Sequence, residues 1–230
     1  MSKYIVASSK PWHRPAFERI HEDEPGQWVY VATRDELNKA VNATDLRYIF
    51  FLHWNWLVPQ EIWSEHECVC FHMTDVPYGR GGSPLQNLIV AGLCETEVTA
   101  LRMVEEMDAG PVYAKRPMSL EGRAEDIYLR AGDLSWEMIL WIIKTEPVPV
   151  PQLGGVTRFT RRRPDQSALP KEGSQNSIYD HIRMLDAPTY PLSFIEHGDF
   201  RLEFSHAELR GEEIHARVVF TRARKDMNQA

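Results

Sequence analysis

The chain has 230 residues, of which 43% are hydrophobic, so it can form one substantial domain with an appendage around a buried core. Its net charge of −7 and pI of about 5.7 argue against an extensive nucleic-acid interface, because phosphate contacts need clustered Lys and Arg. No stretch approaches the roughly 20 apolar residues of a transmembrane helix, and the segment MSKYIVASSK lacks the pattern of a signal peptide. Three cysteines are too few for a disulfide framework, so we expect a cytoplasmic protein with reduced thiols and no membrane partner.

The first half of the chain alternates short β-rich runs with helical patterns, which predicts βαβ units around a mostly parallel sheet. The run YIFFL at residues 48–52 is almost wholly apolar, as is typical of a central parallel strand. We therefore expect an α/β, Rossmann-like fold with helices on both faces of the sheet. The other strands are expected at residues 4–7, 28–31 and 68–71, and the helices at residues 11–20, 34–41 and 84–91.

The second half of the chain predicts a smaller α+β appendage after the sheet is complete. The expected elements are strands at 98–103 and 112–118, a helix at 124–144, a connector over 147–170, a helix at 177–185, a strand at 194–195 and a hairpin over 200–220. We expect residues 1–146 to form the catalytic domain and residues 147–230 to form the appendage. The apolar residues of the hairpin fit core packing and a homodimer face equally well.

Four potential metal ligands stand at alternating positions on one predicted strand: His66, Cys68, Cys70 and His72. Alternate residues of a strand share a face but lie roughly 6.6 Å apart, whereas a zinc ion holds its ligands at about 2.0–2.3 Å. One strand therefore offers at most two neighbouring ligands, and no remote Cys/His pair is evident. We expect no metal site, and we interpret the two cysteines as buried residues of a sheet.

His72 differs from its neighbours because a loop rich in glycine and proline follows it, in the segment CFHMTDVPYGRGGSP at residues 70–84. It stands where a parallel strand should end, and open α/β sheets bind ligands outside the carboxyl ends of their strands. Gly79, Gly81 and Gly82 permit positive φ angles or a close approach of the backbone to a ligand. The pattern also fits a histidine that is satisfied by local contacts at a strand end, so both interpretations stay open.

Two segments carry a family resemblance. The stretch HMTDVPYGRGGSP is similar to a motif of formyltransferases, in which Asn-x-His is followed by a Ser-Leu-Leu-Pro run, an Arg-Gly and a Pro. The stretch ETEVTALRMVEEMDAG resembles the second signature of that family, which ends in an Asp-x-Gly turn. The matching residues are His72, Pro77, Arg80, Gly81 and Pro84 in the first motif and Asp108 and Gly110 in the second. The resemblance to the formyltransferase family extends over most of residues 48–204.

The resemblance implies that 10-formyltetrahydrofolate donates a formyl group to a primary amine, without a metal ion. The amine must be neutral to attack the formyl carbon, so it needs a proton acceptor, and His72 is suited to that role near neutral pH. Asp108 is expected to hold the ring of His72 and to stabilise its charged form.

The chain departs from the family motif at one position. The family usually has Asn two residues before the histidine, where its amide stabilises the oxyanion of the reacting group. Cys70 stands there instead, and a thiol is a weak hydrogen-bond donor. Asn55, which follows the adjacent predicted strand, could supply the missing amide, although a turn-forming role would also explain it.

The remaining candidates for binding residues come from the resemblance and from loop positions. The folate pocket is expected along residues 54–58 and before Asp108, where the family reads the pterin largely with backbone groups. The expected wall residues of this pocket are Trp56, Leu57, Met103 and Val104. The candidates for binding the second substrate are Asp75, Tyr78, Arg80, Gly81, Arg183 and Tyr190. Asp75 could equally cap a loop.

Two acceptors divide the family: the amino group of initiator methionyl-tRNA and that of a nucleotide-linked sugar. The tRNA enzymes carry a full C-terminal barrel and basic surfaces, whereas this chain is acidic and has a short tail. We therefore expect a nucleotide-sugar substrate, for example UDP-linked 4-amino-4,6-dideoxy-N-acetylaltrosamine of a pseudaminic-acid-type pathway, and no nucleic-acid partner. Formyl transfer to methionyl-tRNA and a non-catalytic folate-binding module are the alternatives.

Overall fold

The computed structural model describes residues 2–42 and 45–222, which form two compact units that interleave along the sequence. The first unit comprises Met1–Pro84, Thr96–Met118 and Leu129–Phe159, and the second comprises Leu85–Glu95, Ser119–Tyr128 and Thr160–Ala230. The domain boundary expected between residues 146 and 147 stays a prediction. No helix among the described residues is both long and apolar enough to cross a membrane.

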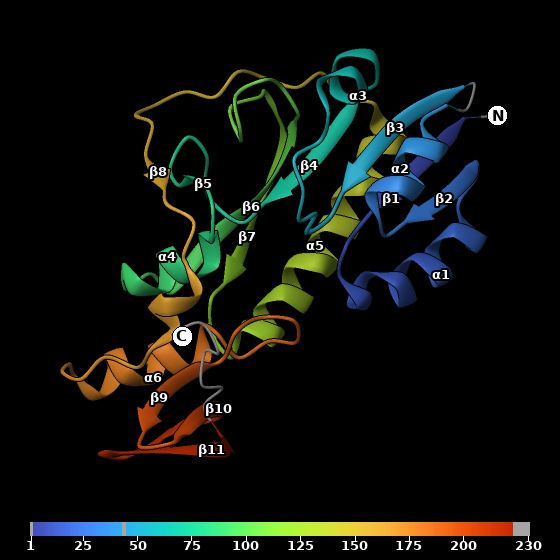
Figure 1. The fold of residues 1–230 in the computed structure, drawn as a ribbon. Coiled ribbons are helices and arrows are strands. Elements are labelled where there is room, and N and C mark those ends of the chain that lie inside the picture. Colours follow the sequence, from blue (N-terminus) through green and yellow to red (C-terminus); the bar gives the residue numbers. More distant parts are fainter. Residues whose placement is uncertain (1, 43–44, 223–230) are drawn as a thin grey trace, which may run out of the picture. The chain divides into compact units, whose positions relative to one another are not determined.

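The first unit is built on a six-stranded sheet with the strand order β2-β1-β3-β4-β6-β7 (Figure 1). β1 lies parallel to β2 and β3, β3 lies parallel to β4, and β6 runs antiparallel to β4. The strands are β1 (Lys3–Ala7), β2 (Gln27–Val31), β3 (Leu46–Phe51), β4 (Cys68–His72), β6 (Glu95–Arg102) and β7 (Val112–Ser119). The predicted mostly parallel α/β sheet is confirmed, and the carboxyl ends of β1, β3 and β4 meet at one edge.

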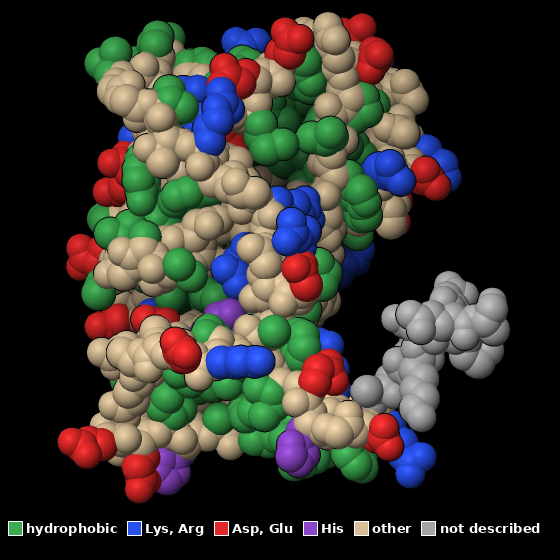
Figure 2. Space-filling view, turned by 60° about the vertical axis from the view of Figure 1, so that its left-hand side comes forward, with side chains coloured by type: hydrophobic (Ala, Val, Ile, Leu, Met, Phe, Trp, Pro, Cys, Tyr) green, Lys and Arg blue, Asp and Glu red, His purple; other side chains and the backbone are tan. Residues whose placement is uncertain are grey.

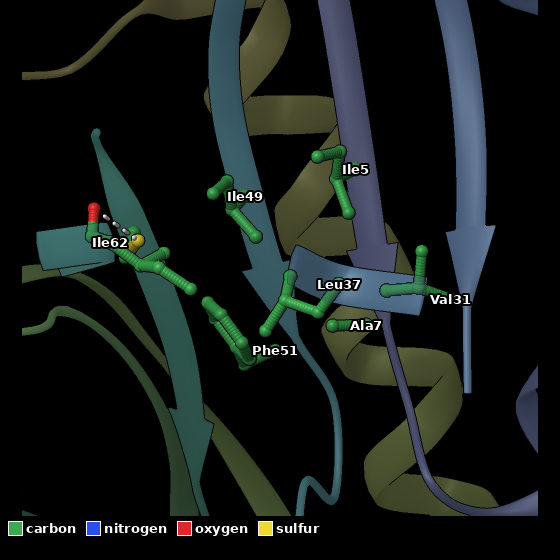
Figure 3. Packing of buried hydrophobic residues seen from close by; sticks show 8 residues of the cluster. Ile5, Ala7, Val31, Leu37, Ile49, Phe51 and Ile62 are labelled. Carbon is green, nitrogen blue, oxygen red and sulfur yellow. Dashed lines mark hydrogen bonds between the residues drawn. The ribbon is translucent and has the colours of Figure 1, made fainter. Parts of the chain in front are cut away.

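Helices cover both faces of this sheet. Leu37 and Ile62 belong to a buried cluster with residues of β1, β2, β3 and β4 on one face (Figure 3). On the other face Phe17 packs against Tyr30 of β2 and against Trp136. The helices that contribute these side chains are α2 (Arg34–Ala40), α3 (Gln60–Glu65), α1 (Arg14–Asp23) and α5 (Ala124–Thr145). Each fully buried Leu, Ile or Phe of such a core stabilises the fold by about 1.5–3 kcal/mol.

The second unit contains most of α4 (Pro84–Val90), α6 (Gln175–Arg183) and an antiparallel sheet in the order β11-β10-β9. The strands of this sheet are β9 (Ser193–His197), β10 (Phe200–Arg210) and β11 (Glu213–Arg222). The predicted α+β appendage with a late hairpin is confirmed. α6 begins earlier than expected because the side chain of Ser174 accepts a hydrogen bond from the backbone N–H of Ser177 and so caps the helix.

Several short elements were not predicted. They are α3, the 3₁₀ helix η2 (Pro164–Ser167) and the parallel pair of β5 (Arg80–Gly81) with β8 (Arg158–Phe159), whereas the 3₁₀ helix η1 (Pro11–His13) lies within the helix expected over residues 11–20. None is long enough to show a hydrophobic period in the sequence. The pairing of β5 with β8 lays the expected connector along the glycine-containing loop that follows His72.

Candidate active site

His72 ends β4 and is almost fully buried, with 8% of its surface exposed. Its Nε2 lies 2.8 Å from the carbonyl oxygen of Gly79. Because a carbonyl can only accept a hydrogen bond, Nε2 must carry the hydrogen in this arrangement. The neutral ring therefore keeps its lone pair on Nδ1, and Nδ1 is the atom that can take up a proton.

Asp108 faces that same nitrogen: its Oδ2 lies 3.6 Å from Nδ1 of His72. The backbone N–H of Gly81 donates a 2.9 Å hydrogen bond to the same Oδ2. Asp108 has a φ of 56°, in the left-handed region that non-glycine residues rarely adopt, at the turn between β6 and β7. The structure thus brings together the two residues that the motifs paired, and Gly79 rather than Asp108 orients the ring.

Cys70 precedes His72 by two positions, so its side chain leaves β4 on the same face. Burial raises the pKa of the Cys70 thiol well above its ordinary value, and the negative charge of Asp108 raises it further. The thiol is therefore protonated at neutral pH and lies near the carboxylate. It is a poor nucleophile and a weak donor at the position where the family motif has an amide.

Two threonines of β6 hold the chain directly after His72. Thr96 donates its hydroxyl to the carbonyl of Met73 at 3.1 Å, and Thr99 donates to the carbonyl of Thr74 at 2.7 Å. Neither threonine was predicted from the sequence to have a role, although both belong to the ETEVT segment. The β-branched residues of this segment indicate only a strand.

The glycines of the loop are required by a neighbouring strand. Gly79 and Gly81 have φ angles of 73° and 109°, as the sequence suggested. A Cβ atom on Gly79 would lie 2.7 Å from the ring of Phe159, and one on Gly81 would lie 2.4 Å from the carbonyl oxygen of Phe159. The close approach that these glycines permit is therefore made by β8.

Other predicted binding residues of this loop already have partners within the first unit. Arg80 is buried, and its guanidinium donates to Gln152 and pairs with Glu106. Tyr78 packs edge-on against Phe159, with ring centroids 5.5 Å apart. Asp75 is exposed and forms an ion pair with Lys115, so it remains the most accessible polar candidate of the loop.

The proposed cofactor-binding residues occupy irregular segments next to the sheet edge. Asn55 and Trp56 are exposed after β3, and Leu57 is 79% exposed. Val104 is also exposed, whereas Met103 is partly buried and packs against the core cluster. Arg183 and Tyr190 belong to the second unit, where Arg183 donates to the carbonyls at positions 120 and 122 and Tyr190 stacks on Tyr128.

A second polar cluster lies at the carboxyl ends of β1 and β3. Nε2 of His13 and Nδ1 of His53 are 2.7 Å apart, and His13 is 1% exposed. Burial lowers the pKa of His13 to about 2, and burial together with the positive charge of Lys10 lowers that of His53 to about 4. Both rings are therefore neutral at neutral pH. Within residues 2–42 and 45–222, no group of three or more His, Cys, Asp or Glu side chains could hold a metal ion.

A histidine whose Nδ1 faces a carboxylate, at the carboxyl edge of an α/β sheet, is an arrangement suited to acid–base chemistry. Comparison with known proteins identifies the chemistry. Residues 164–221 match the family described as methionyl-tRNA formyltransferase, C-terminal domain. The chain is 38% identical to the solved methionyl-tRNA formyltransferase from Clostridium thermocellum, with a TM-score of 0.92 and coverage of 97% of this chain and 100% of that chain.

Two further relatives extend the picture. The methionyl-tRNA formyltransferase of Rickettsia massiliae (strain Mtu5) is 25% identical over 217 residues, which are 90% of this chain and 69% of that protein. HypX from Aquifex aeolicus, solved in complex with tetrahydrofolic acid, shares the fold at 16% identity with a TM-score of 0.71 over 89% of this chain and 37% of that chain. The chain belongs to the formyltransferase family and is a formyl-transferring enzyme, as predicted.

The predicted acceptor was wrong, and so was the exclusion of a nucleic-acid partner. The curated relative named above and the solved structure at 38% identity are methionyl-tRNA formyltransferases, whereas solved sugar N-formyltransferases share the fold at only 12–16% identity. The tail is short, yet it matches their C-terminal domain, and the Clostridium thermocellum protein of that name is covered completely by this chain. The net charge of −7 was also a poor basis for excluding a nucleic-acid partner. It is a sum over the whole chain, whereas binding to RNA depends on the charges of one local surface. On the face shown in Figure 2, basic side chains lie beside one another as well as beside acidic ones.

Proposed function

We propose that this protein transfers the formyl group of 10-formyltetrahydrofolate to the amino group of methionyl-tRNA. The observation that carries the proposal is the 38% identity to a methionyl-tRNA formyltransferase whose solved chain is covered completely. The match of residues 164–221 to the C-terminal domain of such enzymes supports it independently. The pairing of His72 with Asp108 adds the proton acceptor that the reaction needs.

In this mechanism Nδ1 of His72 accepts the proton that the attacking amine releases, because Nε2 is committed to the carbonyl of Gly79. The carboxylate of Asp108, 3.6 Å away, stabilises the imidazolium ion that results. The Gly81 N–H keeps this carboxylate oriented. Bound 10-formyltetrahydrofolate supplies the formyl carbon. Asn55 remains our candidate for the donor to the formyl oxygen, since Cys70 is a protonated thiol.

We assign the folate to the irregular segment after β3. The indole N–H of Trp54 is buried and has no hydrogen-bond partner among the described residues, and an unsatisfied buried donor costs about 1–3 kcal/mol. Trp56 and Leu57 are 37% and 79% exposed next to it. An orphaned donor beside exposed apolar side chains fits an aromatic ligand that carries hydrogen-bond acceptors. The tetrahydrofolic acid bound in the HypX complex supports the same ligand class.

The test is a transfer assay with 10-formyltetrahydrofolate and methionyl-tRNA, in which tetrahydrofolate release and formylmethionine are both measured. We expect release with charged tRNA, none with uncharged tRNA, and a loss of roughly 10²–10⁴-fold in the His72→Ala variant. A wild-type rate that does not exceed the rate of His72→Ala would show that this acceptor is wrong.

A further inference from the structure

We propose that Gln152 is a positioning residue that sets the catalytic carboxylate of Asp108 against His72. Its side chain joins the turn that carries Asp108 to the loop that follows His72. The Gln152 bridge is the set of hydrogen bonds that this side chain makes with Arg80, Asp108 and Gly110. The kinetic part of the proposal rests on the proposed formyl transfer, whereas its structural part does not.

Every hydrogen-bonding site of the Gln152 amide is turned toward the catalytic loops. Nε2 donates to the carbonyl oxygens of Asp108 and Gly110, both at 2.8 Å. Oε1 accepts from Nε and Nη2 of Arg80 at 3.1 and 2.8 Å. An amide can donate two hydrogen bonds and accept two, so the bridge uses its full capacity. No other uncharged side chain of this length offers both functions at one end.

The bridge closes a ring of contacts around the catalytic pair. Arg80 precedes Gly81, whose N–H binds the carboxylate of Asp108 at 2.9 Å. Gln152 binds Arg80 on one side and the backbone of Asp108 on the other. The side chain and the backbone of Asp108 are therefore both tied to the same two-residue stretch of the glycine-containing loop. Neither end of the turn can shift without breaking part of this ring.

The segment around Gln152 is anchored on both sides, which fixes where its side chain points. Val150 exchanges two backbone hydrogen bonds with Val112, of 2.7 and 2.8 Å, directly after the catalytic turn. Thr157 and Phe159 accept backbone hydrogen bonds from Arg80 and Gly82. Pro151 and Leu153, the neighbours of Gln152 in the chain, are exposed. Gln152 is thus the side chain that this stretch turns inward, toward the site.

Asp108 needs such support because its backbone is in the left-handed region, with a φ of 56°. A non-glycine residue in this conformation costs on the order of 1–3 kcal/mol and persists only where the surroundings hold it. The two bonds from Nε2 to the carbonyls on either side of Ala109 hold this turn. Without them we expect the turn to relax and the carboxylate to move away from Nδ1 of His72.

The test uses two variants of the full chain, Gln152→Leu and Gln152→Glu. Gln152→Leu removes the whole bridge. Gln152→Glu keeps the acceptors for Arg80, loses the donors to Asp108 and Gly110, and places a negative charge against those two carbonyl oxygens, so it breaks the half of the bridge at the turn and serves if Gln152→Leu does not fold. The matched controls are Gln27→Leu and Gln27→Glu, at an exposed glutamine at the start of β2.

Two readouts separate positioning from general stability. The first is the amide signal of Gly81 after ¹⁵N-glycine labelling, because this N–H reports directly on the carboxylate of Asp108. The second is the division of the kinetic effect between kcat and KM. We expect the Gly81 amide to move upfield and exchange faster in both variants. We also expect kcat to fall by roughly 10–100-fold, the effect of a misplacement of about 1 Å, with KM within about 3-fold of wild type.

The outcomes are distinct. Variants whose Gly81 amide and kcat both match those of the Gln27 controls would overturn the proposal. A raised KM with an unchanged Gly81 amide would overturn it too, since Gln152 would then act in substrate binding. If the wild type does not formylate methionyl-tRNA, the proposed function fails, and the Gly81 amide alone decides whether the bridge positions Asp108.

Discussion

Nε2 of His13 and Nδ1 of His53 share one hydrogen across 2.7 Å, with the two rings stacked 5.0 Å apart, where β1 and β3 end. This bond cannot form when both rings are protonated, because each nitrogen would then carry a hydrogen. Burial lowers the pKa of both histidines, that of His53 to about 4. A Cβ atom on Gly132 of α5 would lie only 3.0 Å from Cε1 of His13, so the pair has little room to separate.

We predict that acid destabilises the fold through this pair. Unfolded histidines bind protons below a pKa of about 6.5, whereas the folded pair resists protonation, so protons favour the unfolded state. The stability of the pair is fully present above about pH 6.5 and is lost as pH falls toward 4. The shift of His53 corresponds to a loss on the order of 3 kcal/mol. Urea unfolding at several pH values measures it, and an equally steep pH dependence in His13→Gln/His53→Gln would contradict this assignment.

A second prediction concerns the charge of Asp108. Asp108→Asn can still accept from the Gly81 N–H but carries no negative charge, so it cannot stabilise the imidazolium ion of His72. We expect kcat to fall by roughly 10–100-fold while the melting temperature changes little. Asp165→Asn removes an exposed carboxylate that is paired with Arg163 and has no role in the site, and it is the matched control. Steady-state kinetics measure kcat for both variants. An equal loss of kcat in the two variants would contradict a role for the charge of Asp108.

A third prediction tests how the chain compensates for Cys70. If Asn55 supplies the oxyanion donor, Asn55→Ala lowers kcat by roughly 10²–10³-fold. The double variant Asn55→Ala/Cys70→Asn then regains part of the loss, because it restores the amide at the position of the family motif. Formyl-transfer rates of the single and double variants decide the matter. Near-normal turnover in Asn55→Ala, alongside an inactive His72→Ala, would remove Asn55 from the mechanism.

A fourth prediction concerns the turn that carries Asp108. A Cβ atom at Gly110 would lie 1.7 Å from the carbonyl oxygen of Arg102, which is backbone and cannot swing away. Gly110→Ala must therefore open the β6–β7 turn, and we expect a loss of more than about 2 kcal/mol in unfolding free energy together with most of the activity. Gly155→Ala, at a site with no atom within 4 Å of the new Cβ, should change stability by less than about 0.5 kcal/mol. Chemical denaturation measures the free energy of unfolding of both variants. Equal values for Gly110→Ala and Gly155→Ala would refute the steric argument.

The α/β sheet and its helices could be predicted from the sequence, because the strands are apolar runs and the helices show a periodic pattern of apolar residues. It was also sufficient to pair His72 with Asp108, because two motifs located them. It did not reveal that Gly79 orients the imidazole or that Phe159 requires the loop glycines, because both contacts depend on three-dimensional proximity. Gln152 was not predicted as a site residue for the same reason, because a glutamine in a proline-rich connector belongs to no recognisable sequence pattern. The formyl acceptor was predicted wrongly because the prediction used the length of the tail and the net charge. Neither quantity shows which surface of the protein contacts the acceptor.

The dependence of Gly79 and Gly81 on Phe159 has a consequence for how this protein is made. As the nascent chain leaves the ribosome, β1, β3 and β4 can pair early, because they follow one another closely in translation. The stretch after His72 cannot adopt its final shape then, since the strand it rests against has not yet been synthesised. A chain that ends before β8 would therefore contain both His72 and Asp108 but lack the strand against which the loop after His72 is shaped.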